Sequence, residues 1–150
     1  MGQALIQGAR ESGVAGKDIS VSDPSVTARE QCASLFDTNT FSNNEEATKN
    51  ADIVVLSVKP QIIGKALQSV VASGRENLLY ISVAAGVTLE QLNSYSEKNI
   101  AIVRCMPNTP AIIRAGITAL IANQHVTEPQ RSDAENLLTA VGKTVWLDKE

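Results

Sequence analysis

Short apolar runs alternate with helical patterns along this chain of 150 residues, and that alternation limits the folds that the chain can adopt. The runs predict strands at residues 19–22, 53–58, 78–83, 100–105, 117–122 and 144–147. The run from Ile53 to Leu56 is apolar without alternation, which is typical of a strand covered by helices on both faces, so we expect a central strand there. Strands separated by helices predict one continuous α/β domain with a doubly wound, mostly parallel sheet.

Several of the intervening helices carry recognisable start and stop signals. The capping box, in which the first and fourth side chains bond free amides of the first turn, fits residues 42–45, 88–91 and 127–130. Pro24 and Pro129 suit a first helical turn, because the amide hydrogen that proline lacks has no helical partner there. Gly142 is placed to end the helix that follows Thr127.

The first thirteen residues do not fit this pattern of alternation. They predict a helix that ends at Gly13, with Ala4, Leu5 and Ala9 on its inward face. No strand precedes that helix in the sequence. In a doubly wound sheet of strand order 3-2-1-4-5-6 the first strand lies in the middle, so we expect the first strand to be missing from this sheet.

Composition argues against several classes of protein. The net charge is −3, aromatic residues make up 3%, and no Lys/Arg cluster is present, so we expect no nucleic-acid partner. No apolar run approaches the roughly 18 residues that span a bilayer, and no signal segment is found, which predicts a cytoplasmic protein with no membrane partner. Cys32 and Cys105 belong to no CxxC motif and His125 lies in a polar stretch, so we expect reduced cysteines, a solvated histidine and no metal site.

Small, polar or proline-containing segments follow four of the predicted strands. They occupy residues 22–24, 57–60, 82–86 and 104–110. In this type of sheet a ligand binds at the carboxyl ends of the strands, so these segments are the candidate binding site. Taken singly, each of them could be only a tight turn between a strand and a helix.

Three of these segments together resemble a known family. Ser57-Val-Lys-Pro60, Ser82-Val-Ala-Ala-Gly-Val87 and Arg104-Cys-Met-Pro-Asn-Thr-Pro110 are similar, in order and spacing, to segments of the amino-terminal domain of pyrroline-5-carboxylate reductase. Met1-Gly2 resembles the end of that family's glycine-rich phosphate loop. The resemblance implies that residues 1–150 form a partial, Rossmann-like NAD(P)-binding domain. It also implies that the family's carboxyl-terminal helical domain, for substrate binding and dimerisation, is absent from this chain.

The resemblance implies a set of residues that bind NADPH or NADH. These are Met1, Gly2, Asp23, Asn44, Ser57, Val58, Lys59, Pro60, Val83, Ala84, Ala85, Met106 and Asn108. Asp23 could accept hydrogen bonds from the ribose hydroxyls and so favour NAD, whereas the family commonly uses NADPH, and Ser22, Ser25 and Arg29 could offset the carboxylate. The cofactor preference stays open at this point. Asp23 could instead be only a helix cap, and Lys59 a solvated or phosphate-facing side chain.

The implied activity is the reduction of 1-pyrroline-5-carboxylate to L-proline by hydride from the nicotinamide. No catalytic residue is assigned, because the substrate contacts of this family come mostly from the helical domain. We therefore expect this chain to be a fragment that is inactive alone, and the full-length parent to be a homo-oligomer. The alternatives are the nucleotide-binding domain of a β-hydroxyacid dehydrogenase-type reductase and a nucleotide-binding module without catalysis.

Overall fold

The computed structural model describes residues 1–72 and 76–149. Its helices are α1 (Gly2–Glu11), α2 (Val26–Phe36), α3 (Asn44–Thr48), α4 (Ile63–Ala72), α5 (Leu89–Ser94) and α6 (Glu128–Thr139). Three short 3-10 helices are η1 (Gly16–Asp18), η2 (Pro60–Ile62) and η3 (Thr109–Ile113). The strands are β1 (Ser20–Ser22), β2 (Asn39–Phe41), β3 (Ile53–Leu56), β4 (Leu79–Ser82), β5 (Ala101–Pro107), β6 (Gly116–Ala122) and β7 (Gly142–Trp146).

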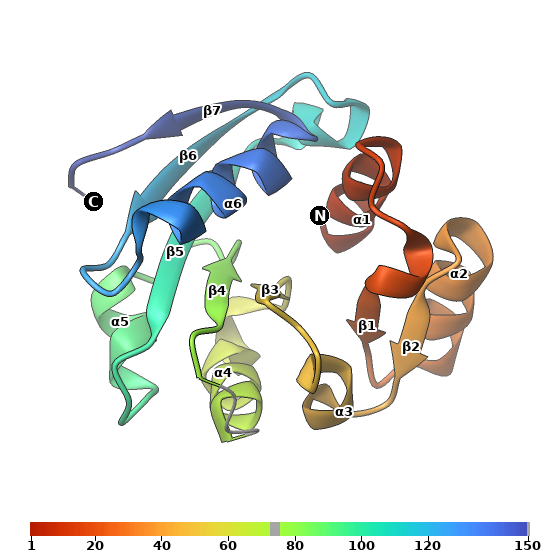
Figure 1. Cartoon of the computed structure of the whole chain (residues 1–150), viewed down its shortest axis with the longest axis horizontal. Helices are drawn as coiled ribbons and strands as arrows, with labels where there is room; N and C mark the ends of the chain where they lie inside the picture. The colour runs from red at the N-terminus through yellow and green to blue at the C-terminus, as the bar shows by residue number, and fades with distance from the viewer. Residues whose placement is uncertain (73–75, 150) are drawn as a thin grey trace.

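The strands of the described residues form two sheets. Five strands lie in the order β3-β4-β5-β6-β7, and β1 pairs with β2 in a separate two-stranded sheet (Figure 1). All neighbours are parallel except β5 and β6, which are antiparallel. The predicted α/β fold with a mostly parallel sheet is therefore confirmed.

One expectation about the sheet is wrong. The apolar run Ile53 to Leu56 forms β3, which lies at an edge of the five-stranded sheet and not at its centre. Val54 and Leu56 are buried on one face, while Ile53 and Val55 are only half-buried. The physical reason is that β3 pairs only with β4 among the described residues, since β1 and β2 pair with each other. In the interior of the sheet, all four residues of β4 are buried.

Two apolar clusters pack against the two faces of the five-stranded sheet. One joins Tyr80 and Ile102 to Leu67 of α4 and Leu92 of α5. The other joins strand residues such as Ile81 to Leu5 of α1, and to Ala134 and Leu138 of α6. Within the described part of the chain, no helix is long and apolar enough to cross a membrane.

Helix α1 lies beside α2 on one side and α6 on the other (Figure 1). Leu5 and Ala9 are buried as expected, and Gly13, with φ +100, follows the end of the helix. Gly8 is also buried. A Cβ on this residue would lie only 2.9 Å from the carbonyl oxygen of Ala140, so glycine allows α1 to pack closely against the end of α6. The helix thus bridges the region between the two sheets.

The capping predictions are correct at two helices and wrong at a third. Thr88 and Thr127 form complete capping boxes with Gln91 and Gln130. The predicted box at residues 42–45 does not form, because Asn43 is the N-cap of α3 and its side chain accepts the Glu46 amide.

The two proline predictions also differ in outcome. Pro129 lies in the first turn of α6, as expected. Pro24 lies outside α2, because Ser25 is the N-cap of that helix and accepts the Ala28 amide. The strand β2 was not predicted, since Asn39-Thr-Phe41 has no apolar run and is held by its pairing with β1.

Gly116 and Gly142 are paired directly across β6 and β7. Gly142 has φ +142, and a Cβ at this position would overlap the carbonyl oxygen of Gly116. The predicted helix end at Gly142 is therefore wrong: α6 ends at Thr139 with Ala140 as its C-cap, and Gly142 begins β7, where it allows β7 to approach β6.

Replacing Gly142 with alanine should lower the free energy of unfolding by about 2–4 kcal/mol, because left-handed strain and overpacking act together. Urea denaturation followed by far-UV circular dichroism measures this change. Lys143→Ala, at the exposed next position of β7, is the control and should change stability by less than about 0.5 kcal/mol. An unchanged stability in Gly142→Ala would contradict the close approach of these two strands.

Cys105 lies on β5 with 1% of its surface exposed. Burial raises the pKa of this thiol from 9.0 to about 12, although the nearby charge of Arg104 opposes the shift. Between about pH 9 and 12 the unfolded chain therefore loses a proton that the folded chain keeps. This contribution to stability is intact below about pH 9 and is lost as the pH rises.

The wild-type free energy of unfolding should therefore fall by about 1 kcal/mol more between pH 7 and pH 10 than that of Cys105→Ala. Urea denaturation of both proteins at the two pH values measures the difference. Comparing the two proteins cancels the contribution of other groups that titrate in this range, such as Tyr80, whose pKa is also raised by burial. Parallel pH profiles would contradict the buried, protonated thiol.

Candidate functional site

The parallel register of β3, β4 and β5 brings three of the predicted site segments to one edge of the sheet. Leu56 is paired with Ser82, and Ser82 with Arg104. Residues 57–60, 83–85 and 106–108 follow these positions on three adjacent strands that run the same way. The sheet pairing therefore places them side by side.

The start of α1 lies at the same edge. A Cβ on Gly2 would be only 3.3 Å from the Cβ of Ser57, so only a small residue fits beside this turn. The N-cap, Met1, makes no side-chain hydrogen bond to the helix, and the first turn contains no acidic residue. The first amides of α1 are thus left to an external acceptor, and such a helix start suits a phosphate group.

Asp23 and Arg29 both bond to the backbone of the turn at the end of β1. Oδ1 of Asp23 accepts the amide of Ser25 at 2.8 Å. Nη1 of Arg29 donates to the carbonyl oxygens of Asp23 at 2.6 Å and Pro24 at 3.2 Å. Asp23 therefore supports the start of α2, although the N-cap itself is Ser25, and Arg29 places its positive charge at the same turn.

Asn44 has a structural partner. Its Nδ2 donates to Oγ of Ser69 at 2.8 Å, which ties α3 to α4. Its predicted contact with the adenosine side of a cofactor stays a prediction. The sequence offered no sign of the bond to Ser69, because the two residues lie 25 positions apart.

The turn that follows β4 presents small side chains. Oγ of Ser82 accepts the Ala84 amide at 3.3 Å. Ala85 and Gly86 are exposed, and Gly86 has φ +74, which favours glycine. At the far end of this turn the carbonyl oxygen of Val87 accepts a hydrogen bond from Nε of Arg104 at 2.7 Å. The turn offers backbone and methyl groups to a flat ligand.

The segment that follows β5 is held from β6 as well. Met106 is 40% exposed, and Oδ1 of Asn108 accepts the Ile117 amide at 2.9 Å. The carbonyl oxygen of Asn108 accepts the Ala111 amide at 3.0 Å at the start of η3. Asn108 is therefore both a predicted cofactor contact and a brace of its own loop.

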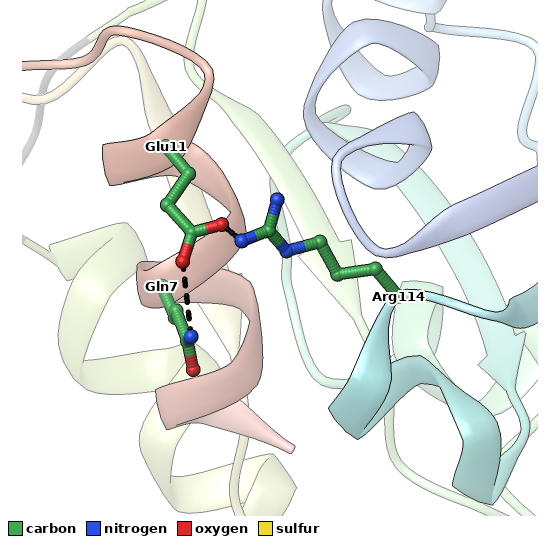
Figure 2. Close-up of polar contacts among 3 residues, drawn as sticks. All are labelled: Gln7, Glu11 and Arg114. Atoms are coloured by element: carbon green, nitrogen blue, oxygen red, sulfur yellow. Dashed lines mark hydrogen bonds and ion pairs between the residues drawn. The ribbon is translucent and has the colours of Figure 1, made fainter.

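An ion pair connects that loop to α1. Arg114, which follows η3 in the left-handed conformation, pairs with Glu11 of α1 (Figure 2). Nε2 of Gln7 donates to Oε1 of the same Glu11 at 3.0 Å. The sequence distance between Glu11 and Arg114 hides this link, which holds α1 and the loop together.

Val58 packs partly against the apolar cluster under α4, whereas Lys59 and Pro60 are exposed at the start of η2. Among the described residues, no group of His, Cys, Asp and Glu could hold a metal ion. A hollow of about 690 Å³ lies away from this edge, by residues at the amino ends of β4 and β5 and by His125, and contains none of the predicted site residues. The edge itself offers backbone amides, small side chains and one exposed lysine, which suits an extended, phosphorylated ligand.

The sequence comparisons point to oxidoreductases. Residues 1–86 match the family described as NADP oxidoreductase, coenzyme F420-dependent. The chain is 40% identical over all of its 150 residues to the pyrroline-5-carboxylate reductase of Pseudomonas aeruginosa, and 39% to that of Haemophilus influenzae. It spans 55% of the length of each of these relatives.

The solved structures agree with the sequence comparisons. The pyrroline-5-carboxylate reductase of Coxiella burnetii has a TM-score of 0.95 at 33% identity, over 99% of this chain and 56% of that one. The Plasmodium falciparum pyrroline carboxylate reductase with NADP bound has a TM-score of 0.86 at 25% identity, over 99% and 54% of the two chains. A prephenate dehydrogenase from Aquifex aeolicus shares the fold alone, with a TM-score of 0.80 at 13% identity, over 98% and 56% of the two chains.

The resemblance expected from the three motifs is therefore confirmed. The chain is a homologue of pyrroline-5-carboxylate reductases that spans about half of their length, and it belongs to the NADP oxidoreductase, coenzyme F420-dependent family.

Proposed function

We propose that this chain is the dinucleotide-binding part of a reductase that converts 1-pyrroline-5-carboxylate to L-proline. The observation that carries the proposal is the edge of the sheet. There, the register of β3, β4 and β5 gathers the three motifs that the chain shares with that reductase family. The curated relatives with this name support the substrate.

Each part of a dinucleotide has a counterpart among the residues of this edge. The first amides of α1, with Met1 and Gly2, would bind the pyrophosphate, and residues 57–60 would line the adenine and its ribose. Residues 83–85 would contact the nicotinamide ribose, and Met106 and Asn108 would face the nicotinamide and the substrate. The close fit of Gly2 beside Ser57 supports this assignment, because a side chain at residue 2 would fill the space beside the turn.

The bound nicotinamide supplies a hydride for the imine carbon, and the imine nitrogen takes the electron pair of the C=N bond and carries a proton. The task of this chain is to fix the geometry between the two reactants. No nucleophile is needed for that task. In our proposal, the remaining substrate contacts come from a helical domain of the whole enzyme.

We propose NADPH as the preferred cofactor. Arg29 offsets the carboxylate of Asp23 at the end of β1, the place where dinucleotide-binding sheets distinguish the ribose 2′ substituent. The two carbonyl acceptors use only Nη1, so Nε and Nη2 provide further donors for a 2′-phosphate. The NADP bound to the Plasmodium falciparum relative supports the same choice.

Arg29→Met should weaken NADPH binding by about 10-fold or more and change NADH binding by less than about 2-fold, because only NADPH loses a charge-assisted contact. Titration monitored by nicotinamide fluorescence measures both dissociation constants. Arg10→Met is the matched control, since Arg10 also donates to a backbone carbonyl, that of Val14, but from the last turn of α1. Equal losses for NADPH and NADH would contradict the role of Arg29.

The reductase proposal is tested by adding 1-pyrroline-5-carboxylate to the purified chain with NADPH. We expect NADPH binding without appreciable turnover, because this chain positions the cofactor and a second domain completes the substrate site. Absorbance at the nicotinamide band measures turnover, and fluorescence measures binding. Failure to bind either NADPH or NADH would refute the proposed function, and rapid proline formation would refute the need for a second domain.

A further inference from the structure

Arg104 stands out on β5 because it is a charged residue in the interior of a largely buried strand. Its neighbours Val103 and Cys105 are buried, and its own side chain is half-buried. By the alternation of the strand it lies on the same face as Ile102, which belongs to the apolar cluster under α4 and α5. A guanidinium on such a face is costly unless it makes hydrogen bonds.

One hydrogen bond of Arg104 is directed at the turn after β4. Nε of Arg104 donates to the carbonyl oxygen of Val87 at 2.7 Å. Val87 is 5% exposed and directly precedes Thr88, the N-cap of α5. The bond thus fixes the point at which the turn enters the helix.

The two ends of the turn are packed and its middle is not: Ala84 and Val87 are buried in the apolar cluster, and the amide of Val83 donates to the carbonyl oxygen of Leu56. At its start, Oγ of Ser82 accepts the Ala84 amide. Ala85 and Gly86 are exposed, and a Cβ on Gly86 would meet no atom within 4 Å. Arg104 therefore adds a side-chain hydrogen bond at the far end of a turn whose middle, Ala85 and Gly86, is not packed.

We propose that Arg104 is a positioning residue that holds residues 83–87 in the conformation that receives the nicotinamide half of the cofactor. This inference rests on the proposed function. Arg104 acts from β5 on the turn after β4, whereas Asp23 and Arg29 lie at the end of β1 in the other sheet. Loss of Arg104 therefore disturbs one half of the dinucleotide site and leaves the adenosine half intact.

The test compares NADPH with 2′,5′-ADP, which carries the adenosine half and the 2′-phosphate but no nicotinamide. Isothermal titration gives both dissociation constants for the wild-type chain, Arg104→Met and Arg104→Lys. Arg104→Met should weaken NADPH binding by about 10-fold and change 2′,5′-ADP binding by less than 2-fold, because a hydrogen bond from a charged donor is lost. Arg104→Lys, which keeps a charged donor, should recover part of the affinity for NADPH.

A purely structural role for Arg104 would weaken both ligands alike, and that result would overturn the inference. Unchanged binding of both ligands would overturn it as well. Arg10→Met, which removes a guanidinium elsewhere, should leave both constants unchanged. If Arg104→Met does not unfold cooperatively, the comparison of Arg104→Lys with Arg104→Gln replaces it and is judged by the same NADPH-to-2′,5′-ADP ratio.

Amide hydrogen exchange gives a second measurement that needs no ligand. In Arg104→Met, exchange should become faster at residues 84–89 and stay unchanged at residues 117–121 of β6. Exchange that is unchanged at residues 84–89, or faster throughout the sheet, would overturn the inference. If the wild-type chain binds neither NADPH nor 2′,5′-ADP, the proposed function fails, while the exchange measurement still decides whether Arg104 holds the turn.

Discussion

The parallel backbone pairing of β3, β4 and β5 is the constraint on which the site depends. It sets Leu56, Ser82 and Arg104 in one row across the sheet, so that three sequence-distant turns begin side by side. The pairing continues into the turns, where the amide of Val83 donates to the carbonyl oxygen of Leu56 at 3.3 Å. All four residues of β4, the middle strand of these three, are buried, so the row is centred on a fully packed strand.

Helix α1 reaches this row, whereas the turn after β1 lies at the end of a strand of the other sheet. Helix α1 is held through Gly8 against α6 and through Glu11 against Arg114, and its first residues therefore stay beside Ser57. The turn after β1 is shaped by Asp23 and Arg29. Exposed ion pairs contribute little to stability, so the apolar contacts of Leu5 supply most of the energy that docks α1.

Local signals in the sequence predict much of this architecture, and their limits have physical causes. Apolar runs located six of the seven strands, because burial selects Val, Ile and Leu; β2 was missed because its pairing with β1, and not its composition, makes it a strand. The edge position of β3 could not be foreseen, since an apolar run shows that a strand is packed but not which strands lie beside it. The N-cap predicted at Ser42 lies one position later, at Asn43, and the box at residues 42–45 does not form, because Asn43 competes successfully with Ser42.

The sequence predicted that three turn segments lie together, which the sheet pairing confirms, but not the side-chain contacts that hold them. The motif segments are local in sequence and could be read directly. Three side-chain contacts join residues that only the fold brings together, so no local sequence pattern predicts them. They are the contacts of Arg104 with Val87, of Asn108 with Ile117 and of Glu11 with Arg114. A residue with no predicted ligand contact, such as Arg104, can therefore help to fix the geometry of a motif.

Ala85 and Gly86 are exposed, so the sequence of this turn can change without disturbing the core. A Cβ on Gly86 would meet no atom within 4 Å, so larger side chains or a longer loop at this turn would reshape this part of the edge without repacking the sheet. The same frame is found in a prephenate dehydrogenase at 13% identity, a protein named for a different substrate. The arrangement of strands is thus kept while most of the sequence differs, and the turns at the edge of the sheet are the places where side chains can change without loss of packing.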